Sequence, residues 1–337
     1  MIITKTPFRM SFFGGGTDMP QFFKENGGAV LSTTFDKYCY VNVRHLPPFF
    51  EYTTEASYAK IERVTDLDDM EHPLIRNAMR MLDMHELRIT YEADLPARTG
   101  LGTSSSFAVG LLNACYCLKG KYADKKQLAD DAIYLERVLC NEAGGWQDQI
   151  AASFGGLNKI TFFGDDYQVD RVIISPERKK MLNDNLMLFF TGFTRFSSEI
   201  QQSTGAVIKD KATQLREMLV LVDEAESVLT NKERDLDDFG RLLDETWKLK
   251  RQTGSKISTG SIDELYARAI KAGALGGKLL GAGGGGFLLF YVQPEKRREV
   301  MAAMHDLLYV PFQFENAGTR VIYYSAEFYD PQLRREK

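Results

Sequence analysis

Alternating apolar and polar residues divide this chain into short strands and longer amphipathic helices. Leu87, Ile89 and Tyr91 are separated by polar residues, which is the period of a half-buried strand. Leu128 and Ala132 instead recur at the helical spacing of four residues. Strands are expected at 2–7, 38–44, 87–91, 157–163, 167–174, 186–192, 287–292 and 320–325, and helices at 72–84, 105–118, 124–141, 205–229, 236–251, 261–274 and 294–308.

The order of these elements predicts an α+β fold in two domains. At 337 residues the chain is long for one hydrophobic core, so two domains are expected. The charged stretch 176–185 precedes a strand at 186–192 that opens a second unit. We therefore place the domains at 1–182 and 183–337, and we expect the strand at 320–325 to close the second one.

A loop rich in glycine and hydroxyl residues lies before the helix expected at 105–118. Gly100 and Gly102 allow backbone angles that other residues resist, and they let a ligand approach the backbone closely. The hydroxyls of residues 103–106 are expected to cap the helix. Because a helix N-terminus has unpaired N–H groups and partial positive charge, the loop favours a bound phosphate. The alternative is a capped core helix after a glycine turn.

A second glycine cluster, Gly14-Gly-Gly-Thr-Asp18, follows the first strand. Its glycines expose backbone N–H groups, and Asp18 places one carboxylate at the mouth of the turn. Arg9 lies on the strand that enters this loop and could face the same pocket. The alternative is a flexible loop in which Asp18 acts as a cap.

Two further carboxylates are candidates for chemistry. Glu136 lies in or beside the apolar stripe of the helix at 124–141, where a carboxylate costs free energy unless it is paired or binds a cation. A buried ion pair with an arginine and a metal site remain equal alternatives. Asp148 lies between two glycine pairs, so it either caps the next helix or points into a cleft.

Composition excludes several classes of function. With 42 basic and 46 acidic residues and a net charge of −4, the chain has no sign of a nucleic-acid partner. The first residues resemble no signal peptide, and apolar runs such as 287–292 are too short for a bilayer, so we expect a cytoplasmic protein without membrane contact. Its four cysteines form no C-x-x-C pair, and its four histidines lack metal-ligand spacing, which disfavours a zinc site.

Two well-known phosphate-binding motifs do not explain the glycine loops. The P-loop pattern is absent, because Gly120-Lys121 and Gly277-Lys278 are not followed by serine or threonine. The Rossmann spelling occurs at Gly281-Ala-Gly-Gly-Gly-Gly286, but there it leads into a strand instead of a helix.

Taken in order, the three glycine stretches resemble those of the GHMP small-molecule kinases. The first family motif resembles Pro7 through Asp18, the second Pro96 through Ser105, and the third Lys278 through Gly286. The likeness covers almost the whole chain. It implies an N-terminal domain of the ribosomal protein S5 domain 2 type, a ferredoxin-like C-terminal domain, and an active site between them.

Within the family, four stretches resemble the branch that contains the bacterial heptose 7-phosphate kinases and the fucokinases. They are Phe12-Phe-Gly-Gly-Gly-Thr-Asp18, Gly102-Thr-Ser-Ser-Ser-Phe107, Gly145-Trp-Gln-Asp-Gln149 and Thr191-Gly-Phe-Thr-Arg195. Galactokinases have Glu-His where this chain has Gly15-Gly16, which disfavours galactose. Arg98 stands where the family often has glycine, which implies a different start of the phosphate loop.

The resemblance implies roles for individual residues in an ATP- and Mg²⁺-dependent phosphoryl transfer. Asp148 would be the catalytic base and Arg9 would steady it, and Ser104 and Glu136 would hold Mg²⁺, which prefers hard oxygen ligands. The residues implied for nucleotide binding are Gly100, Leu101, Gly102, Thr103, Ser104, Ser105, Gly283 and Gly284, and those for substrate binding are Gly16, Thr17, Asp18, Asp148 and Arg195.

The implied reaction is phosphorylation of the anomeric hydroxyl of a sugar, with a manno-heptose 7-phosphate as the expected substrate. Arg195 is the candidate for the substrate's own phosphate, because a guanidinium binds phosphate through two parallel hydrogen bonds. The alternative for Arg195 is a surface ion pair with Glu199. Fucose or another hexose is the alternative substrate, and a non-catalytic sensor of sugar and ATP is the alternative class. The sequence leaves the oligomeric state open.

Overall fold

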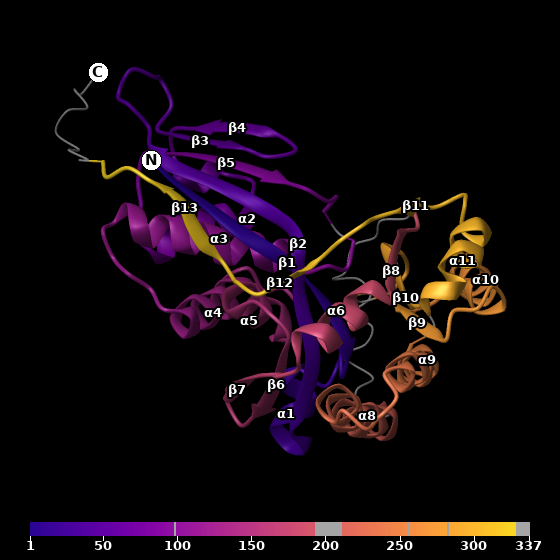
Figure 1. The fold of residues 1–337 in the computed structure, drawn as a ribbon. Helices are drawn as coiled ribbons and strands as arrows, with labels where there is room; N and C mark the ends of the chain where they lie inside the picture. The colour runs from indigo at the N-terminus through magenta and orange to yellow at the C-terminus, as the bar shows by residue number, and fades with distance from the viewer. Residues whose placement is uncertain (98, 193–210, 255–256, 282, 328–337) are drawn as a thin grey trace.

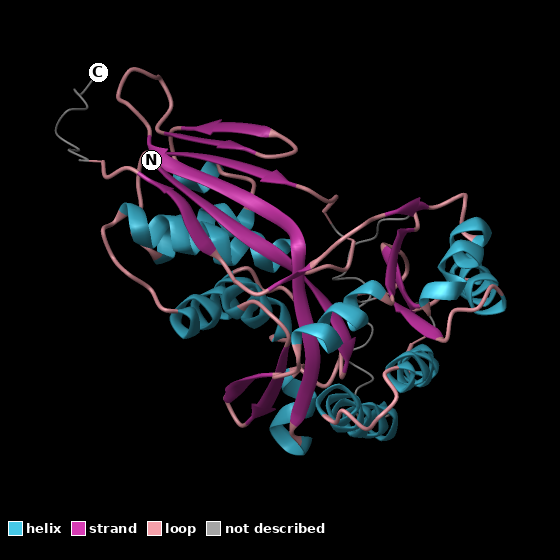
Figure 2. Cartoon of the chain, viewed as in Figure 1, coloured by secondary structure: helices cyan, strands magenta, loops and turns pink. Residues whose placement is uncertain are grey.

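A computed structural model describes residues 1–97, 99–192, 211–254, 257–281 and 283–327, and these form two units that each contain a sheet (Figure 1). The described strands form a nine-stranded sheet in one unit and a four-stranded sheet in the other. Figure 2 shows several helices packed along the larger sheet and others around the smaller one.

The larger sheet is organised around two long antiparallel strands, β1 and β2. The main path has the order β13-β1-β2-β5-β3-β4, while β6 and β12 also pair with β2, and β7 pairs with β6. The strands are β1 (Ile2–Phe13), β2 (Gly28–His45), β3 (Thr54–Ser57), β4 (Ile61–Val64), β5 (Leu87–Ala93), β6 (Asn158–Phe163), β7 (Asp166–Arg171), β12 (Phe314–Glu315) and β13 (Arg320–Tyr324).

The register of β1 against β2 shifts between Pro7 and Phe8. Proline has no N–H to donate to the ladder, and such irregularities re-aim the side chains that follow them. Arg9, which follows directly, has 4% exposure. The first four residues of β1 alternate between buried and partly exposed, whereas the remaining eight are all buried.

Helix α3 forms the centre of the helical layer on the larger sheet. Thirteen of its 16 residues are buried, as expected for a helix that is apolar on all sides. A Cβ at Gly110 would lie 2.8 Å from Thr6 Oγ1, so the glycine lets α3 approach β1 closely. The helical segments of this unit are α1 (Pro20–Asn26), η1 (Leu67–Asp69), α2 (Pro73–Met81), α3 (Thr103–Leu118), α4 (Lys125–Ile133), η2 (Tyr134–Leu139), α5 (Gln147–Phe154) and α6 (Pro176–Asp184).

The smaller sheet has the antiparallel order β11-β8-β10-β9. In chain order this is the arrangement 4-1-3-2, with helices after its first and third strands, which is a ferredoxin-like topology. Its elements are β8 (Leu186–Phe190), α8 (Ala212–Thr230), α9 (Asp237–Gln252), α10 (Gly260–Lys271), β9 (Gly276–Leu279), β10 (Phe287–Tyr291), η4 (Pro294–Lys296), α11 (Arg297–Ala303) and β11 (Leu308–Tyr309).

One hydrophobic cluster continues from the larger sheet into α8, α9 and β10. The ring of Phe239 in α9 packs edge-on against Phe12 and Phe13 in β1, with centroid distances of 5.3 and 5.1 Å. The two units therefore share buried apolar surface, and burial of that surface stabilises their mutual position.

The last strand differs from our expectation. Residues 320–324 form β13, which pairs antiparallel with β1 in the larger sheet, so this segment does not close the second unit. The β-branched and aromatic residues of 321–324 favour a strand but do not say which sheet it joins. The charged stretch that we expected as a linker is helix α6, and Arg178 in it donates to Val228 O and Leu229 O at the end of α8. A boundary between 182 and 183 stays a prediction.

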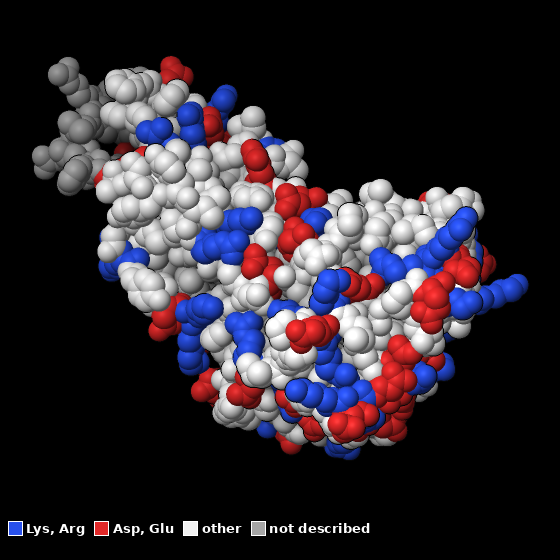
Figure 3. All heavy atoms as spheres, in the orientation of Figure 1, with Lys and Arg blue, Asp and Glu red and all other residues white. Residues whose placement is uncertain are grey.

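The helices that the structure describes include none whose length and apolar character would suffice to cross a bilayer. On the face shown in Figure 3, acidic and basic side chains are interspersed, and neither sign dominates the face.

Candidate active site

The glycine loop after β5 delivers the chain to the N-terminus of α3. Gly100 and Gly102 have φ values of +82° and +73°, which favour glycine. The helix begins at Thr103, and its N-cap is Gly102 without a side-chain cap. Our expectation that hydroxyls cap this helix is therefore wrong, because the hydroxyls of Ser104 and Ser106 bind Glu136 and Pro7 O instead. Without a side-chain cap, the first-turn N–H groups can bind an anion.

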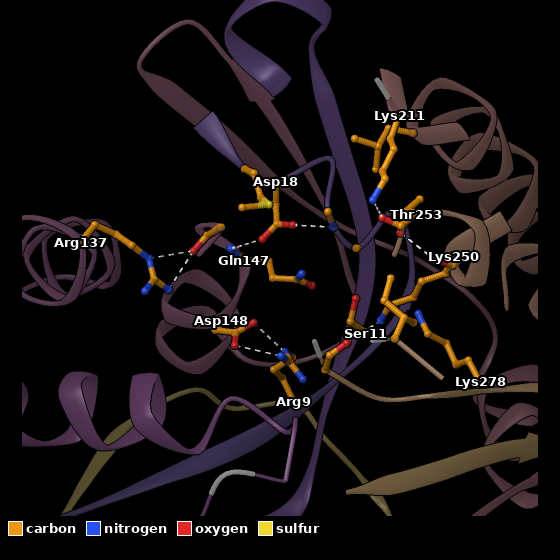
Figure 4. A pocket seen from close by; sticks show the side chains of 17 residues that line it. Arg9, Ser11, Asp18, Arg137, Gln147, Asp148, Lys211, Lys250, Thr253 and Lys278 are labelled. Atoms are coloured by element: carbon orange, nitrogen blue, oxygen red, sulfur yellow. Dashed lines mark hydrogen bonds and ion pairs between the residues drawn. The ribbon is translucent and has the colours of Figure 1, made fainter. Parts of the chain in front are cut away.

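Arg9 and Asp148 form a two-pronged ion pair beside this loop (Figure 4). Arg9 Nε lies 2.8 Å from Asp148 Oδ1, and Nη2 lies 2.8 Å from Oδ2. The third nitrogen, Nη1, donates to Gly100 O at 2.7 Å. A Cβ at Gly102 would lie 3.3 Å from Arg9 Cγ and 3.4 Å from Asp148 Oδ2. The structure thus places the carboxylate at the start of α3, with both oxygens held in position.

Asp18 holds the turn that carries Asp148. Its buried carboxylate accepts hydrogen bonds from Gly16 N at 2.9 Å and from Gln147 N at 3.3 Å. A Cβ at Gly145 would lie 1.8 Å from Asp18 Oδ2, which explains the glycine there. Burial raises the pKa of Asp18, as does the neighbouring charge of Asp148, while the two N–H groups oppose that rise.

The other predicted substrate residues of this loop differ in position. Gly16 lines the pocket beside Asp18. Thr17 is fully buried, and its hydroxyl contacts Gly14 O and Ala29 O at 2.8 Å each, so its side chain stabilises the loop. Substrate contacts from Gly16, Thr17 and Asp18 stay predictions.

Glu136 lies in a π-helical turn, η2, where we expected a continuous α-helix. The turn buries Glu136 to 1% exposure, whereas Leu139, at the end of the turn, is 36% exposed. Extra residues per turn rotate the side chains that follow, and such turns are frequent at functional sites. The sequence pattern does not reveal this widening, because the apolar spacing alone also fits an α-helix.

The partners of Glu136 are polar and neutral. Its Oε1 accepts from Ser104 Oγ at 2.8 Å, and its Oε2 accepts from Gln149 Nε2. Within the described ranges, Glu136 has no arginine or lysine partner, so the ion-pair alternative finds no support there. Mg²⁺ commonly takes one or two protein ligands and completes its shell with phosphates and water. The hard oxygens of Ser104 and Glu136 fit that ion.

The third glycine motif packs directly on the second. A Cβ at Gly281 would lie 2.2 Å from Gly100 Cα, and one at Gly286 would lie 2.2 Å from Thr99 O. Gly283 and Gly284 lie against Ile257, and Gly284 N donates to Ile257 O at 3.0 Å. Nucleotide contacts from Gly283 and Gly284, and from residues 100–105, stay predictions.

Two residues of the sequence-based interpretation lie outside the described part of the chain. They are Arg98, at the start of the phosphate loop, and Arg195, the candidate for the substrate's own phosphate.

The pocket in Figure 4 lies between the two units and includes residues that the sequence analysis did not select. Ser11, Gln147 and Arg137 come from the first unit, and Lys250 and Lys278 come from the second. Lys278 is the first residue of the third motif, a position that could have drawn attention. Lys250 follows Lys248-Leu249 on an amphipathic helix, where a lysine normally indicates a solvated face.

The comparisons with known proteins agree with this geometry. Residues 73–156 match the N-terminal domain of GHMP kinases, and residues 225–310 match their C-terminal domain. The D-glycero-alpha-D-manno-heptose 7-phosphate kinase of Campylobacter jejuni is 28% identical, over 95% of this chain and 98% of the relative.

Two more relatives extend the comparison. The bifunctional fucokinase/GDP-fucose pyrophosphorylase of Arabidopsis thaliana is 24% identical over 89% of this chain, which spans only 31% of that protein. A crystal structure of a D-glycero-D-manno-heptose 1-phosphate kinase from Bacteroides thetaiotaomicron superposes with a TM-score of 0.72 and 25% identity, over 97% of this chain and 100% of that one. The chain therefore belongs to the GHMP kinase family and has its two-domain fold.

Proposed function

We propose that this GHMP kinase transfers the γ-phosphoryl group of ATP to the anomeric hydroxyl of D-glycero-D-manno-heptose 7-phosphate, giving the 1,7-bisphosphate and ADP. The protein is an ATP-dependent sugar kinase, and the heptose phosphate is the finer part of the proposal. The observation that supports it most strongly is the Arg9–Asp148 pair at the uncapped start of α3. The proposed base, Asp148, therefore lies next to the proposed phosphate site at the start of α3.

In the proposed reaction, Asp148 acts as the general base. Its carboxylate takes the proton of the anomeric hydroxyl, and the resulting oxygen attacks the γ-phosphorus while ADP leaves. Arg9 fixes both carboxylate oxygens, and its link to Gly100 O holds this pair at the phosphate loop. The first-turn N–H groups of α3 stabilise the charge on the phosphoryl oxygens.

Ser104 and Glu136 would hold Mg²⁺ beside the nucleotide phosphates. Bound there, the ion would neutralise phosphate charge during the transfer. The chain's own part is to keep the two oxygens together, which the hydrogen bond between Ser104 and Glu136 does. Gln149 donates to the second oxygen of Glu136 and restricts its rotation.

The choice of sugar rests on the relatives and on the first glycine loop. Relatives named as heptose phosphate kinases cover nearly the whole chain. Gly15-Gly16 replaces the Glu-His of galactokinases at the pocket wall. We keep Arg195 as a predicted ligand of the substrate phosphate, and we place the reaction in the cytoplasm.

A fucokinase is the second candidate, because the Arabidopsis thaliana fucokinase matches most of this chain. A sensor without turnover is disfavoured because Arg9, Asp148, Ser104 and Glu136 are all present and in mutual contact as two pairs. A protein that only binds sugar would not need a fixed base beside the phosphate loop.

A panel assay separates these candidates. ADP formation would be measured with heptose 7-phosphate, unphosphorylated heptose, L-fucose, galactose and mannose, each at several concentrations. We expect kcat/KM to be highest for heptose 7-phosphate by about tenfold or more. A preference for L-fucose would contradict the heptose proposal, and ATP binding without turnover on any sugar would indicate a sensor.

A further inference from the structure

Two lysines are buried in the pocket wall that the second unit contributes. Lys250 in α9 is 9% exposed and Lys278 in β9 is 1% exposed. Lys250 Nζ donates to Gly281 O, and Lys278 Nζ donates to Phe12 O at 2.8 Å. Across the residues with defined positions, neither ammonium has a carboxylate within ion-pair distance. A buried ammonium without a counter-ion is costly, so a site that retains one commonly serves an anionic ligand.

Ser11 supplies a second, independent observation. Its side chain lines the same pocket at 6% exposure, and its hydroxyl has no hydrogen-bond partner among the described groups. Buried polar atoms are nearly always hydrogen-bonded, and an exception needs a cause. Lys278 binds the carbonyl of the next residue, Phe12, and so fixes the strand that carries this hydroxyl.

The position of this cluster indicates which anion it binds. Figure 4 shows Lys250 and Lys278 entering the pocket from one side and Asp148 from the other, with Ser11 between them. Arg9 is occupied by Asp148 and Gly100 O. A sugar whose anomeric hydroxyl faces Asp148 would extend its opposite end toward the lysines. In a heptose 7-phosphate that end carries the phosphate.

The charges around Lys250 agree with an anion site. The pKa of Lys250 is lowered to about 8, chiefly by burial and also by the neighbouring charge of Arg9, while Asp18 and Asp148 act in the opposite direction. Burial also lowers the pKa of Lys278, and the charge of Lys250 contributes. A bound phosphate would relieve this mutual repulsion.

We infer that Lys250 and Ser11, with Lys278 fixing the strand between them, form the subsite for the sugar substrate's own phosphate group. Lys250 supplies the cation, and Ser11 donates its free hydroxyl. The inference rests on the proposed function, because it requires a phosphorylated sugar. These residues are proposed in addition to Arg195, the phosphate ligand predicted from the sequence, which lies outside the described residues.

The test compares Lys250→Met with Lys248→Met. Methionine keeps most of the length and volume of lysine but has no charge. Lys248 is on the same helix, with a side chain 66% exposed and paired with Asp244 at 2.6 Å, so it is a matched control. KM and kcat would be measured with heptose 7-phosphate and with unphosphorylated heptose.

We expect Lys250→Met to raise KM for heptose 7-phosphate by about ten- to a hundredfold, as loss of a charged hydrogen bond should. KM for ATP and kcat/KM for unphosphorylated heptose should change by less than about threefold. Lys248→Met should behave as wild type. Ser11→Ala removes one hydroxyl, is mild enough to fold, and should raise KM for the phosphorylated sugar by about three- to tenfold.

Three results would overturn the inference. Equal losses of kcat with both sugars would place Lys250 at the transferred phosphoryl group. Wild-type kinetics for Ser11→Ala would show that the Ser11 hydroxyl does not bind the phosphate of the sugar. A lowered Tm with unchanged KM in Lys250→Met would make the lysine a support for Gly281. If the wild type itself showed no preference for phosphorylated sugar, the proposed function would fail instead, which the same wild-type data distinguish.

Discussion

Both oxygens of Asp148 are engaged by one guanidinium, and this contact decides what the residue can do. The pairing with Arg9 fixes the direction of the carboxylate. The turn just before Asp148 is also held in place, because Asp18 accepts a hydrogen bond from Gln147 N and leaves no room for a side chain at Gly145. A carboxylate held in a fixed direction beside the proposed phosphate site is what a general base for phosphoryl transfer requires.

Replacement of Asp148 by asparagine tests this role. Asparagine has the same shape but cannot accept the proton, so kcat should fall by roughly 10²- to 10⁴-fold while the Kd for ATP stays within a few-fold. Steady-state rates and calorimetric titration with a non-hydrolysable ATP analogue would measure both. Asp170→Asn, on an exposed position, is the control. A wild-type kcat in Asp148→Asn would remove the residue from catalysis.

Glu136→Gln tests the proposed metal ligand. The amide keeps the hydrogen bond with Ser104 possible but loses the negative charge that Mg²⁺ prefers. The Mg²⁺ concentration for half-maximal rate should therefore rise by about tenfold or more. Rates at a series of Mg²⁺ concentrations, with Glu142→Gln as a neighbouring control, would show this. An unchanged Mg²⁺ dependence together with a lower Tm would make Glu136 a structural residue.

Lys250 predicts a specific pH dependence. The groups that face it are Arg9 from β1, Asp18 from the first glycine loop, Asp148 from α5 and Lys278 from β9. With a pKa of about 8 in the free enzyme, Lys250 loses its proton as pH rises through 8. The cation is then lost, so kcat/KM for phosphorylated sugar should fall above pH 8, by about tenfold per unit.

A pH profile of kcat/KM would measure this basic limb. In Lys250→Arg the guanidinium stays charged, so the fall should move to higher pH. The unphosphorylated sugar should show no such limb in the wild type. If kcat/KM fell at the same pH in Lys250→Arg as in the wild type, or fell equally with both sugars, the titrating group would not be Lys250.

At the scale of elements, two glycine loops from different units meet backbone to backbone. Gly281 and Gly100 both have positive φ, and neither position has room for a Cβ. Both loops, and the helix that follows the loop with Gly100, were predicted from the sequence. The sequence could not show that the loops touch, because long-range contact between loops leaves no periodic signal.

The contact between these loops predicts the effect of Gly281→Ala. The new Cβ would lie 2.2 Å from Gly100 Cα, so the phosphate loop must shift, and KM for ATP should rise by about tenfold or more. Gly120→Ala is the matched control, since Gly120 also has a positive φ of +67° but open space around it. Similar ATP kinetics in both variants would show that backbone strain alone, and not the clash, matters.

Helix η2 marks the limit of sequence reasoning at this scale. Periodicity predicted the helical region and drew attention to Glu136 as a carboxylate beside an apolar stripe. The π-helical turn that buries it was not predictable, because its residues also fit the α-helical pattern. Lys250 was missed for a related reason, since a lysine within an amphipathic helix is ordinarily solvent-exposed.

At the scale of the whole molecule, the α+β class and the two-domain fold were expected from the sequence and its family resemblance, whereas the path of the C-terminus was not. The β-branched and aromatic residues of 321–324 favoured a strand, but the choice of its partner strand depends on which sheet edge is open. Pairing of β13 with β1 ties the C-terminal segment to the first unit. The hydrophobic cluster around Phe239 contains residues of both units and so also holds them together.

Phe239→Ala should therefore destabilise both units together. Loss of a fully buried phenylalanine costs about 3–5 kcal/mol in the free energy of unfolding. The chain has two tryptophans, Trp146 in the first unit and Trp247 in the second, so Trp146→Phe and Trp247→Phe backgrounds report each unit separately. Urea titrations followed by fluorescence should show the same lowered midpoint for both.

Phe163→Ala is the control for this substitution, because Phe163 is 47% exposed and its loss should change the midpoint little. If Trp247 alone reported the destabilisation of Phe239→Ala, the two units would unfold independently, and their shared cluster would not couple them.

The position of the new phosphate on the product tests the proposed reaction most directly. Wild-type protein would be incubated with ATP, Mg²⁺ and D-glycero-D-manno-heptose 7-phosphate, and the product examined by phosphorus NMR. We predict a second sugar phosphorus signal coupled to the anomeric proton, formed in equal amount to ADP. A new phosphate on any other carbon, or no second phosphate while L-fucose is phosphorylated efficiently, would contradict the proposed function.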